Sequence, residues 1–207
     1  MISFSKKINI GKLLFALIPF TVKMTNAVQG YGTTGMSGSD ALAIAANANK
    51  VWMVNSAGRI YEFVNNTWIQ KQGSDGRDIA INSDGAIWLV NSAGRIYKYN
   101  GSSWTQMPGS AGKRIAAGNG QVWLVNSQGE IYKFNGSAWQ RMPGSDGRDI
   151  AVSNDGKIWL TNTVGKIYEW NGQSWQQLDG SDGNTLSANT HKLYFVNTAG
   201  RIYYRTY

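Results

Sequence analysis

The sequence predicts an all-β protein, a five-bladed β-propeller with four-stranded blades. Three observations lead to this prediction. A unit of about 35 residues occurs five times, each unit contains four short runs of alternating apolar residues, and no helical period is sustained beyond residue 27. A single antiparallel unit of this size leaves its sheet uncovered, whereas radial repetition packs each sheet against its neighbours. Residues 31–207 are therefore expected to form one propeller domain.

The units are aligned by a pentapeptide that places an aromatic residue second and an asparagine last. It occurs at Val51–Asn55, Ile87–Asn91, Val122–Asn126, Ile158–Asn162 and Leu193–Asn197. The five asparagines are 36, 35, 36 and 35 residues apart, and a glycine follows three residues after each. An Ile-Tyr pair begins two residues beyond that glycine. So regular a spacing indicates copies of one structural unit.

Strand positions follow from apolar alternation and from the turns between the strands. In the second unit we expect strands at 78–82, 86–91, 95–100 and 103–107. They are separated by Ser-Asp-Gly, Ser-Ala-Gly and Asn-Gly-Ser segments, in which glycine is available for positive φ. Small residues in the first strand, such as Ala80, suit a position beside the crowded central axis. The first strand is therefore expected to be innermost.

The two ends of the chain predict how the ring closes. The last unit stops at Tyr207, after its third strand. The missing fourth strand resembles the segment at 34–39, which aligns with residues 105–110 of the second unit. We expect Thr33–Met36 to complete the last blade. Such a strand would close the ring without a covalent bond and cover an edge that otherwise invites pairing with another chain.

Residues 1–27 have the composition of a secretory signal peptide. Lys6, Lys7 and Lys12 precede the apolar run 13–22, and Thr25 and Ala27 form a small-residue cleavage site. The apolar run is too short to span a hydrocarbon core of about 30 Å. The alternative is an interfacial or disordered tail. The signal-peptide interpretation predicts a secreted or periplasmic protein without a membrane span.

Composition excludes several classes of function. Without cysteine the chain has no disulfide, thiolate zinc site or cysteine nucleophile, and one histidine, His191, leaves little for metal binding. The net charge is +8, but residues 1–27 supply four lysines and no acid, so the remainder carries only +4. Basic and acidic residues are interleaved there, which argues against nucleic acid as a partner. No cofactor is indicated.

The unit resembles the tectonin repeat, which is also found in tachylectin-type and fish-egg lectins. The match is to the pattern G-x-[IV]-W-x-V-N-x-x-G-x-I-Y-x-[YF]-x-G-x-x-W, and it covers essentially all of residues 31–207. Tectonin proteins are usually described as six-bladed, whereas this chain supplies five units. The resemblance implies non-catalytic recognition of carbohydrate, including lipopolysaccharide and other surface glycans. It carries no specific binding residues across to this chain.

Candidate ligand residues come from one face of the expected propeller. The interblade loops repeat Gly-Ser-Asp-Gly, and the turns between second and third strands offer an amide, a hydroxyl and a basic side chain. Such groups suit sugar hydroxyls or an anionic sugar acid. The predicted ligand-binding residues are Asp75, Arg77, Asn91, Ser92, Arg95, Asp146, Arg148, Asn162, Lys166, Asp182, Asn197 and Arg201. The competing interpretation of these residues is ordinary turn chemistry and a solvated basic face.

Three functions compete at this level. The first is a secreted lectin that binds glycans or lipopolysaccharide, anionic ones included, through several weak sites between blades. The second is a protein-interaction scaffold that needs no sugar. The third, a glycosidase, requires paired carboxylates in a deep pocket, and the short loops here offer no walls for one. The sequence therefore predicts a binding protein without catalytic residues and without a metal site.

Overall fold

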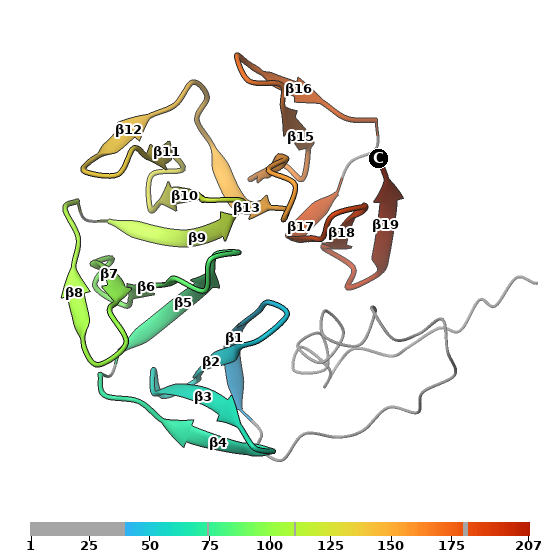
Figure 1. Ribbon diagram of the computed structural model, residues 1–207. Coiled ribbons are helices and arrows are strands. Elements are labelled where there is room, and N and C mark those ends of the chain that lie inside the picture. The colour runs from blue at the N-terminus through green and yellow to red at the C-terminus, as the bar shows by residue number, and fades with distance from the viewer. Residues whose placement is uncertain (1–39, 74, 110, 180–181) are drawn as a thin grey trace, which may run out of the picture.

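The computed structural model describes residues 40–73, 75–109, 111–179 and 182–207, which form five antiparallel sheets arranged around an axis (Figure 1). Blade 1 consists of β1 (Ala41–Ala46), β2 (Val51–Asn55), β3 (Ile60–Val64) and β4 (Thr67–Gln70). Blade 2 consists of β5 (Gly76–Ile81), β6 (Ile87–Asn91), β7 (Ile96–Tyr99) and β8 (Trp104–Gln106). Blade 3 consists of β9 (Gly112–Gly118), β10 (Gln121–Asn126), β11 (Ile131–Phe134) and β12 (Trp139–Arg141). Blade 4 consists of β13 (Gly147–Val152), β14 (Ile158–Asn162), β15 (Ile167–Trp170) and β16 (Trp175–Gln177). Blade 5 consists of β17 (Gly183–Ala188), β18 (Lys192–Asn197) and β19 (Ile202–Thr206).

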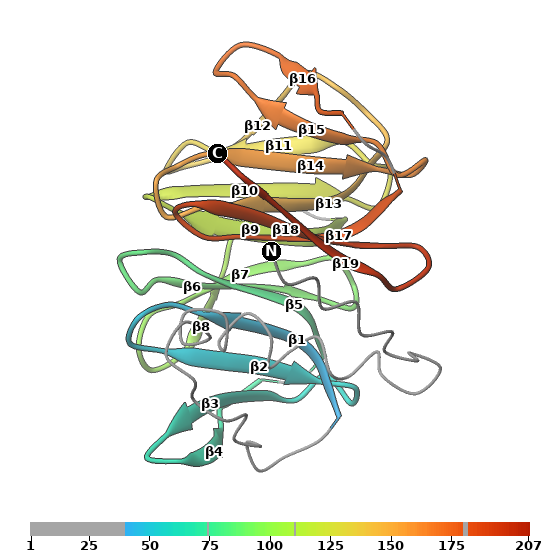
Figure 2. The same cartoon turned by 90° about the vertical axis from the view of Figure 1, so that its right-hand side faces the viewer.

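The predicted five-bladed propeller is confirmed, and every regular element in the described residues is a strand. Within each blade the strands pair in chain order, and the first strand lies nearest the axis (Figure 1). Figure 2 shows the strands running across the thickness of the propeller, so that the turns gather at two opposite faces. One face carries the turns between second and third strands and the interblade loops. We call it the loop face, and the other the hairpin face.

The core consists of interfaces between consecutive blades. The second-strand tryptophans Trp52, Trp88, Trp123 and Trp159 are all at most 2% exposed. At the first interface Trp52 packs on Tyr99 and Trp104 of blade 2, with ring centroids 5.1 and 6.1 Å apart. Burying an aromatic side chain removes roughly 150–250 Å² from water, which at about 25 cal/mol per Å² stabilises by about 4–6 kcal/mol gross. These contacts stabilise a chain that has no disulfides.

The fourth-strand tryptophans also join one blade to the next. The indole Nε1–H groups of Trp104, Trp139 and Trp175 donate to the carbonyl oxygens of Gln72, Pro108 and Pro143, each at 2.9 Å. Each acceptor belongs to the loop that leaves the preceding blade. The hydrogen bonds give these half-buried rings an interblade role.

A backbone contact fixes the spacing of the blades on the loop face. The N–H groups of Gly76, Gly112, Gly147 and Gly183 donate to carbonyls of Gly58, Gly94, Gly129 and Gly165 at 2.8–2.9 Å. Gly94 has φ +74, and a Cβ built on it would lie 2.8 Å from the Cα of Ala111 in the next blade. Only glycine satisfies both the positive φ and this close approach. In blades 1 to 4 the glycine after the motif asparagine is thus a blade-joining residue.

Blade 5 differs from the other blades on the side that faces blade 1. Ile202 is 37% exposed, whereas its equivalents Ile60, Ile96, Ile131 and Ile167 are at most 3% exposed. Successive innermost strands contact each other from β1 through β17, but no comparable contact joins β17 to β1 in the described parts of the chain. The strand predicted at Thr33–Met36, and with it the closure of the ring, lies outside the described residues. That closure stays a prediction.

The predicted signal peptide at 1–27 also lies outside the described residues. Within the described ranges, no helix is long and apolar enough to cross a membrane.

The predicted closing strand can be tested by cross-linking, because the protein has no cysteine of its own. Lys98 pairs with Thr105 in blade 2, and the equivalent partners in blade 5 are Tyr204 and Thr34. Directly opposed residues have Cβ atoms close enough for a disulfide. We expect the Thr34→Cys/Tyr204→Cys variant to oxidise to an intramolecular disulfide, detected by mass spectrometry. The out-of-register pair Thr34→Cys/Arg205→Cys is the control. Equal cross-linking of both pairs would contradict the predicted pairing of Thr34 with Tyr204.

Deleting the closing segment should expose the edge of β19. We compare a chain that begins at residue 40 with one that begins at residue 28. The shorter chain is expected to melt at a lower temperature and to form dimers or larger species on gel filtration, because an uncovered strand edge pairs with other chains. Identical melting and a monomeric state for both chains would show that residues 28–39 do not close the ring.

Candidate functional site

A groove on the loop face lies between blades 1 and 2, where the sequence predicts ligand binding. It has a volume of about 340 Å³. Three of the predicted residues, Asp75, Arg77 and Ser92, line it. Blade 1 contributes the turn Ser56-Ala57-Gly58, and Leu42 of β1 adds an apolar patch. Asn91 and Arg95 belong to the same blade as Asp75 but do not line this groove.

The loop carboxylates are held by hydroxyl groups of the same blade. Ser92 Oγ donates to Asp75 Oδ1, Thr163 Oγ1 to Asp146 Oδ1, and Thr198 Oγ1 to Asp182 Oδ1. The three aspartates have φ between 71° and 82°, a conformation that aspartate tolerates better than most residues. The hydroxyl bond orients each carboxylate while its second oxygen can still accept from a ligand. The structure thus repeats one acid–hydroxyl pair in blades 2, 4 and 5.

The predicted asparagines have a structural role in their turns. The side-chain oxygens of Asn91, Asn162 and Asn197 accept the N–H groups of Arg95, Lys166 and Arg201 at 2.7–2.8 Å. Asn55 and Asn126 make the same bond to the residue four positions later. An asparagine that satisfies its own turn is a common device. The recurrence of this residue is therefore explained by the turn, and ligand contact would use the amide nitrogen or the remaining lone pair of the oxygen.

The basic residues of the predicted set differ in exposure. Arg77 and Arg148 are half-buried near the start of the innermost strands, whereas Arg95, Lys166 and Arg201 are exposed on the loop face. In blades 2, 4 and 5 this face thus carries both aspartates and basic side chains.

Blade 3 lacks both the loop aspartate and the basic residue that precedes the third strand in blades 2, 4 and 5. Ala111 replaces the loop aspartate, and Ser127 Oγ donates instead to Gln128 Oε1 at 3.0 Å. Glu130 replaces the basic residue and forms an ion pair with Arg141 at 3.0 Å. Hydrogen bonds from Tyr132 and Asn126 lower the pKa of Glu130. Blade 3 therefore lacks the acid–hydroxyl pair, and the carboxylate of its Glu130 is already paired with Arg141.

Two aspartates on the innermost strands each connect their own blade to the next one. Asp78 Oδ2 accepts the N–H of Ile115 in blade 3 at 2.9 Å, and Asp149 Oδ2 accepts the N–H of Leu186 in blade 5 at 2.8 Å. Arg114 Nε lies 3.7 Å from Asp149 Oδ1. Burial raises the pKa of Asp78 to about 6, although the Arg114 guanidinium and the Ile115 N–H oppose the shift. Burial also raises the pKa of Asp149.

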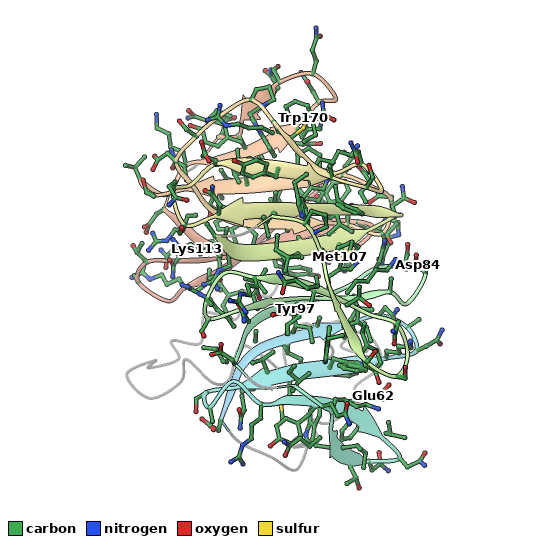
Figure 3. All side chains as sticks on the ribbon, turned by 90° about the vertical axis from the view of Figure 1, so that its left-hand side faces the viewer. Glu62, Asp84, Tyr97, Met107, Lys113 and Trp170 are labelled. Atoms are coloured by element: carbon green, nitrogen blue, oxygen red, sulfur yellow. The ribbon has the colours of Figure 1, made fainter. Side chains whose placement is uncertain are left out.

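Sequence reasoning missed a second cavity, on the hairpin face. Its volume is about 400 Å³, and charged residues from both blades line it, among them Glu62 and Asp84. Figure 3 shows Asp84 and Lys113 at opposite edges of the sheets, which mark the hairpin and loop faces respectively. The signal that would have found the cavity is Lys71, which stands where blades 2, 3 and 4 have Met107, Met142 and Leu178. In the described residues no cluster of three or more histidine or acidic side chains could hold a metal ion.

Comparison with known proteins identifies the repeat. A family model described as Tectonin domain matches residues 40–113 and 111–207. No curated protein matches the chain. Among solved structures, YCF48 bound to D1 peptide is 16% identical with a TM-score of 0.57 and covers 84% of this chain and 67% of its own. Virginiamycin B lyase from Staphylococcus aureus was solved with quinupristin as a catalytically inactive variant. It is 14% identical with a TM-score of 0.58, and the match covers 85% of this chain and 72% of the lyase chain. BamB from Moraxella catarrhalis is 16% identical with a TM-score of 0.58, and the match covers 86% of this chain and 62% of the BamB chain.

At these identities the solved structures show a shared propeller fold and nothing about a shared ligand.

The buried carboxyl of Asp78 predicts a pH-dependent stability. Its folded pKa of about 6 lies above the unfolded value of about 3.9, so the folded state retains a proton that the unfolded chain releases between these values. The free energy of unfolding should therefore fall as pH rises from about 4 to 6, by up to about 3 kcal/mol from this group. Urea denaturation at pH 4.5 and 7.5 measures the change.

The variant Asp78→Asn isolates this contribution. Its side chain does not ionise, so its stability should decline less between the two pH values than that of the parent. Asp179→Asn, which alters an exposed carboxyl, serves as the control and should keep the parental profile. Parallel profiles for Asp78→Asn and the parent would contradict the assignment.

Proposed function

The chain belongs to the Tectonin domain family, and we propose that it is a secreted or periplasmic lectin that binds surface glycans or lipopolysaccharide. The ligand would be held in repeated weak grooves between blades on the loop face. The observation that carries the proposal is the recurrence of an acid–hydroxyl pair beside a basic side chain. Asp75 with Ser92 and Asp146 with Thr163 are the best-developed examples.

The groups in these grooves suit sugar hydroxyls. A carboxylate oxygen accepts from a hydroxyl, and such charge-assisted hydrogen bonds are stronger than neutral ones. Arg77 lines the same groove as Asp75, and Arg148 occupies the equivalent strand position after Asp146. Basic side chains favour anionic sugars and the phosphate groups of lipopolysaccharide. Blade 3, with Ala111 and Glu130, is expected to bind worst.

Shallow grooves of this kind would act together. A site with a few polar contacts has an affinity near the millimolar range, but several such sites on one rigid ring can engage a dense glycan surface at once. The avidity gain is roughly 10²–10⁴ when the geometry allows simultaneous contact. The radial arrangement of equivalent loops provides that geometry (Figure 1).

The proposal includes the absence of catalysis. The loop-face groove combines one carboxylate with a hydroxyl and a guanidinium, whereas glycoside hydrolysis requires two carboxyl groups on either side of a scissile bond. Secretion rests on the signal-like segment at residues 1–27.

A protein-interaction scaffold is the second candidate function. Leu42 is 54% exposed and lines the loop-face groove, so an apolar side chain of a peptide would find a contact there. YCF48, which shares the fold, was solved bound to a peptide. This alternative predicts binding without any sugar.

A glycan array probed with the chain from residue 28 onward tests the lectin proposal. For a glycan that binds, we expect the double variant Asp75→Asn/Asp146→Asn to bind about 10–100-fold more weakly, because each substitution removes a charge-assisted hydrogen bond. Asparagine retains the tolerance for positive φ and can still accept from the neighbouring hydroxyl. The variant should therefore fold normally, which circular dichroism verifies.

Asp155→Asn is the matched control, since it alters a turn carboxylate of blade 4 outside the interblade loops. It should bind the glycan like the parent. Equal affinity of the parent and the double variant would refute the loop-face site. Absence of binding to every glycan on the array would refute the lectin and favour the scaffold.

A further inference from the structure

Asn-Gly dipeptides occur at four turns of the propeller, and this dipeptide is chemically labile. Three of them join the third and fourth strands of blades 2, 3 and 4, and they are Asn100-Gly101, Asn135-Gly136 and Asn171-Gly172. The fourth, Asn119-Gly120, joins β9 to β10 on the innermost part of blade 3. All of these residues are exposed. Because glycine has no side chain, its backbone nitrogen is unshielded and can attack the side chain of the preceding asparagine.

The reaction is a cyclisation followed by hydrolysis. The glycine nitrogen loses its proton and forms a bond to Cγ of the asparagine, the bond between Cγ and Nδ2 breaks, and ammonia leaves. Water then opens the five-membered succinimide at either carbonyl and gives aspartate or isoaspartate. Nothing is oxidised or reduced, and water is the only co-reactant. Each conversion replaces a neutral amide with a carboxylate, which is ionised at neutral pH.

The state of the glycine N–H separates the three outer turns from the inner one. Gly120 N–H donates to Asn82 Oδ1 at 3.0 Å, and this bond has to open before the nitrogen can react. Within the described parts of the chain, no acceptor is bound by the N–H groups of Gly101, Gly136 and Gly172. A Cβ built on any of these three glycines would meet nothing within 4 Å. Water can therefore reach their nitrogens and remove the proton.

The same criterion protects the Asp-Gly dipeptides, which can also cyclise. Five of them lie wholly within the described residues, and in each the glycine N–H donates to a backbone carbonyl at 2.8–3.1 Å. These glycines are Gly76, Gly85, Gly147, Gly156 and Gly183. A carboxylate is also a poorer electrophile than a neutral amide. The fold, and not the dipeptide alone, thus decides which turns can react.

The asparagine side chain in each outer turn is held by donors that favour the attack. Asn100 Oδ1 accepts the N–H groups of Ser102 and Ser103 at 3.0 and 2.8 Å. Asn135 and Asn171 accept the equivalent pairs of N–H groups at 2.8–3.0 Å. Negative charge develops on this oxygen when Cγ is attacked, and N–H groups that already point at it stabilise that charge.

We propose that Asn100, Asn135 and Asn171 deamidate spontaneously in the folded protein, whereas Asn119 is protected. All three sites lie on the hairpin face, and Asn100 and Gly101 line its cavity, so conversion of Asn100 places a carboxylate at the cavity rim. Three conversions lower the net charge of residues 28–207 from +4 to +1. The inference concerns the covalent state of the protein and is independent of the ligand that it binds.

Incubation of the chain from residue 28 in mildly alkaline buffer, followed by digestion and mass spectrometry, measures each site separately. We expect the peptides with Asn100, Asn135 and Asn171 to deamidate at least about tenfold faster than the peptide with Asn119, because the bond of Gly120 must first open. A parallel incubation in urea is the control. The unfolded chain lacks that bond, so all four asparagines should convert at similar rates.

Ion-exchange chromatography of the intact protein gives an independent count of the sites. The parent should develop three successive acidic forms. Asn100→Gln should remove one of them, because glutamine cyclises to a six-membered ring, which forms more slowly. Asn119→Gly is the matched control, since Asn119 has φ 48 and glycine accepts a positive φ without strain. This variant should keep all three acidic forms, and circular dichroism verifies that both variants fold.

The outcomes decide the proposal in either direction. Selective conversion of the three outer asparagines in the folded protein, with that selectivity lost in urea, establishes the sites. Conversion of Asn119 in the folded protein as fast as that of the outer asparagines, or loss of an acidic form in Asn119→Gly, would overturn the assignment. So would a folded protein whose outer asparagines stay intact over the period in which the unfolded chain deamidates.

Discussion

The contact between a turn glycine of one blade and the first residues of the next is the constraint on which the rest of the structure depends. Gly58 takes φ +73, and a Cβ on it would lie 2.8 Å from the Cα of Asp75. Its carbonyl also accepts the N–H of Gly76. This contact determines where each innermost strand begins, and the tryptophan cores can form only when the blades approach this closely. It also forces the residue at position 75 into a positive φ, so its side chain projects at the groove.

That geometry explains why structural and candidate binding residues coincide on the loop face. Aspartate tolerates the left-handed conformation and accepts a bond from the nearby hydroxyl, so it satisfies the turn. The same carboxylate lines the groove beside Arg77. Ala111 adopts φ 64 at the equivalent position, which shows that the fold does not require a carboxylate there. Aspartate adopts this conformation more readily than alanine, so the turn itself accounts for the acid at positions 75, 146 and 182. The ligand contact proposed above would use the carboxylate oxygen that the hydroxyl bond leaves free.

The sequence predicted the fold well because the repeat specifies it five times over. Strand order follows from apolar alternation and spacing, and the innermost position of the first strand follows from its small residues. The candidate binding residues are less determined by the sequence. Asn91 is a predicted ligand residue that recurs beside a turn, and recurrence does not distinguish an amide that caps its own turn from one that also faces a ligand. The hairpin-face cavity was not predicted, because the repeat pattern does not show that Lys71, at a position occupied by Met or Leu in blades 2 to 4, lines a space between two blades.

Departures from the repeat also indicate that the junction between blades 5 and 1 has its own geometry. Ala41 begins β1, where Gly76, Gly112, Gly147 and Gly183 begin the other first strands. At Gly183 a Cβ would lie 2.8 Å from a side-chain carbon of the preceding blade, so an alanine there requires the neighbouring blade to stand farther away.

Blade 5 shows a matching change on its other side. Arg205 occupies the position of the aromatic residues Tyr99, Phe134 and Trp170, and Tyr207 packs on Trp159 instead, with ring centroids 4.7 Å apart. Blade 5 thus contacts Trp159 of blade 4 through Tyr207, whereas Ile202 is exposed on the side that faces blade 1. Ala41 in place of the glycine and the exposure of Ile202 distinguish this junction from those between the other blades. Both features are compatible with the prediction that a separate segment of the chain closes the ring.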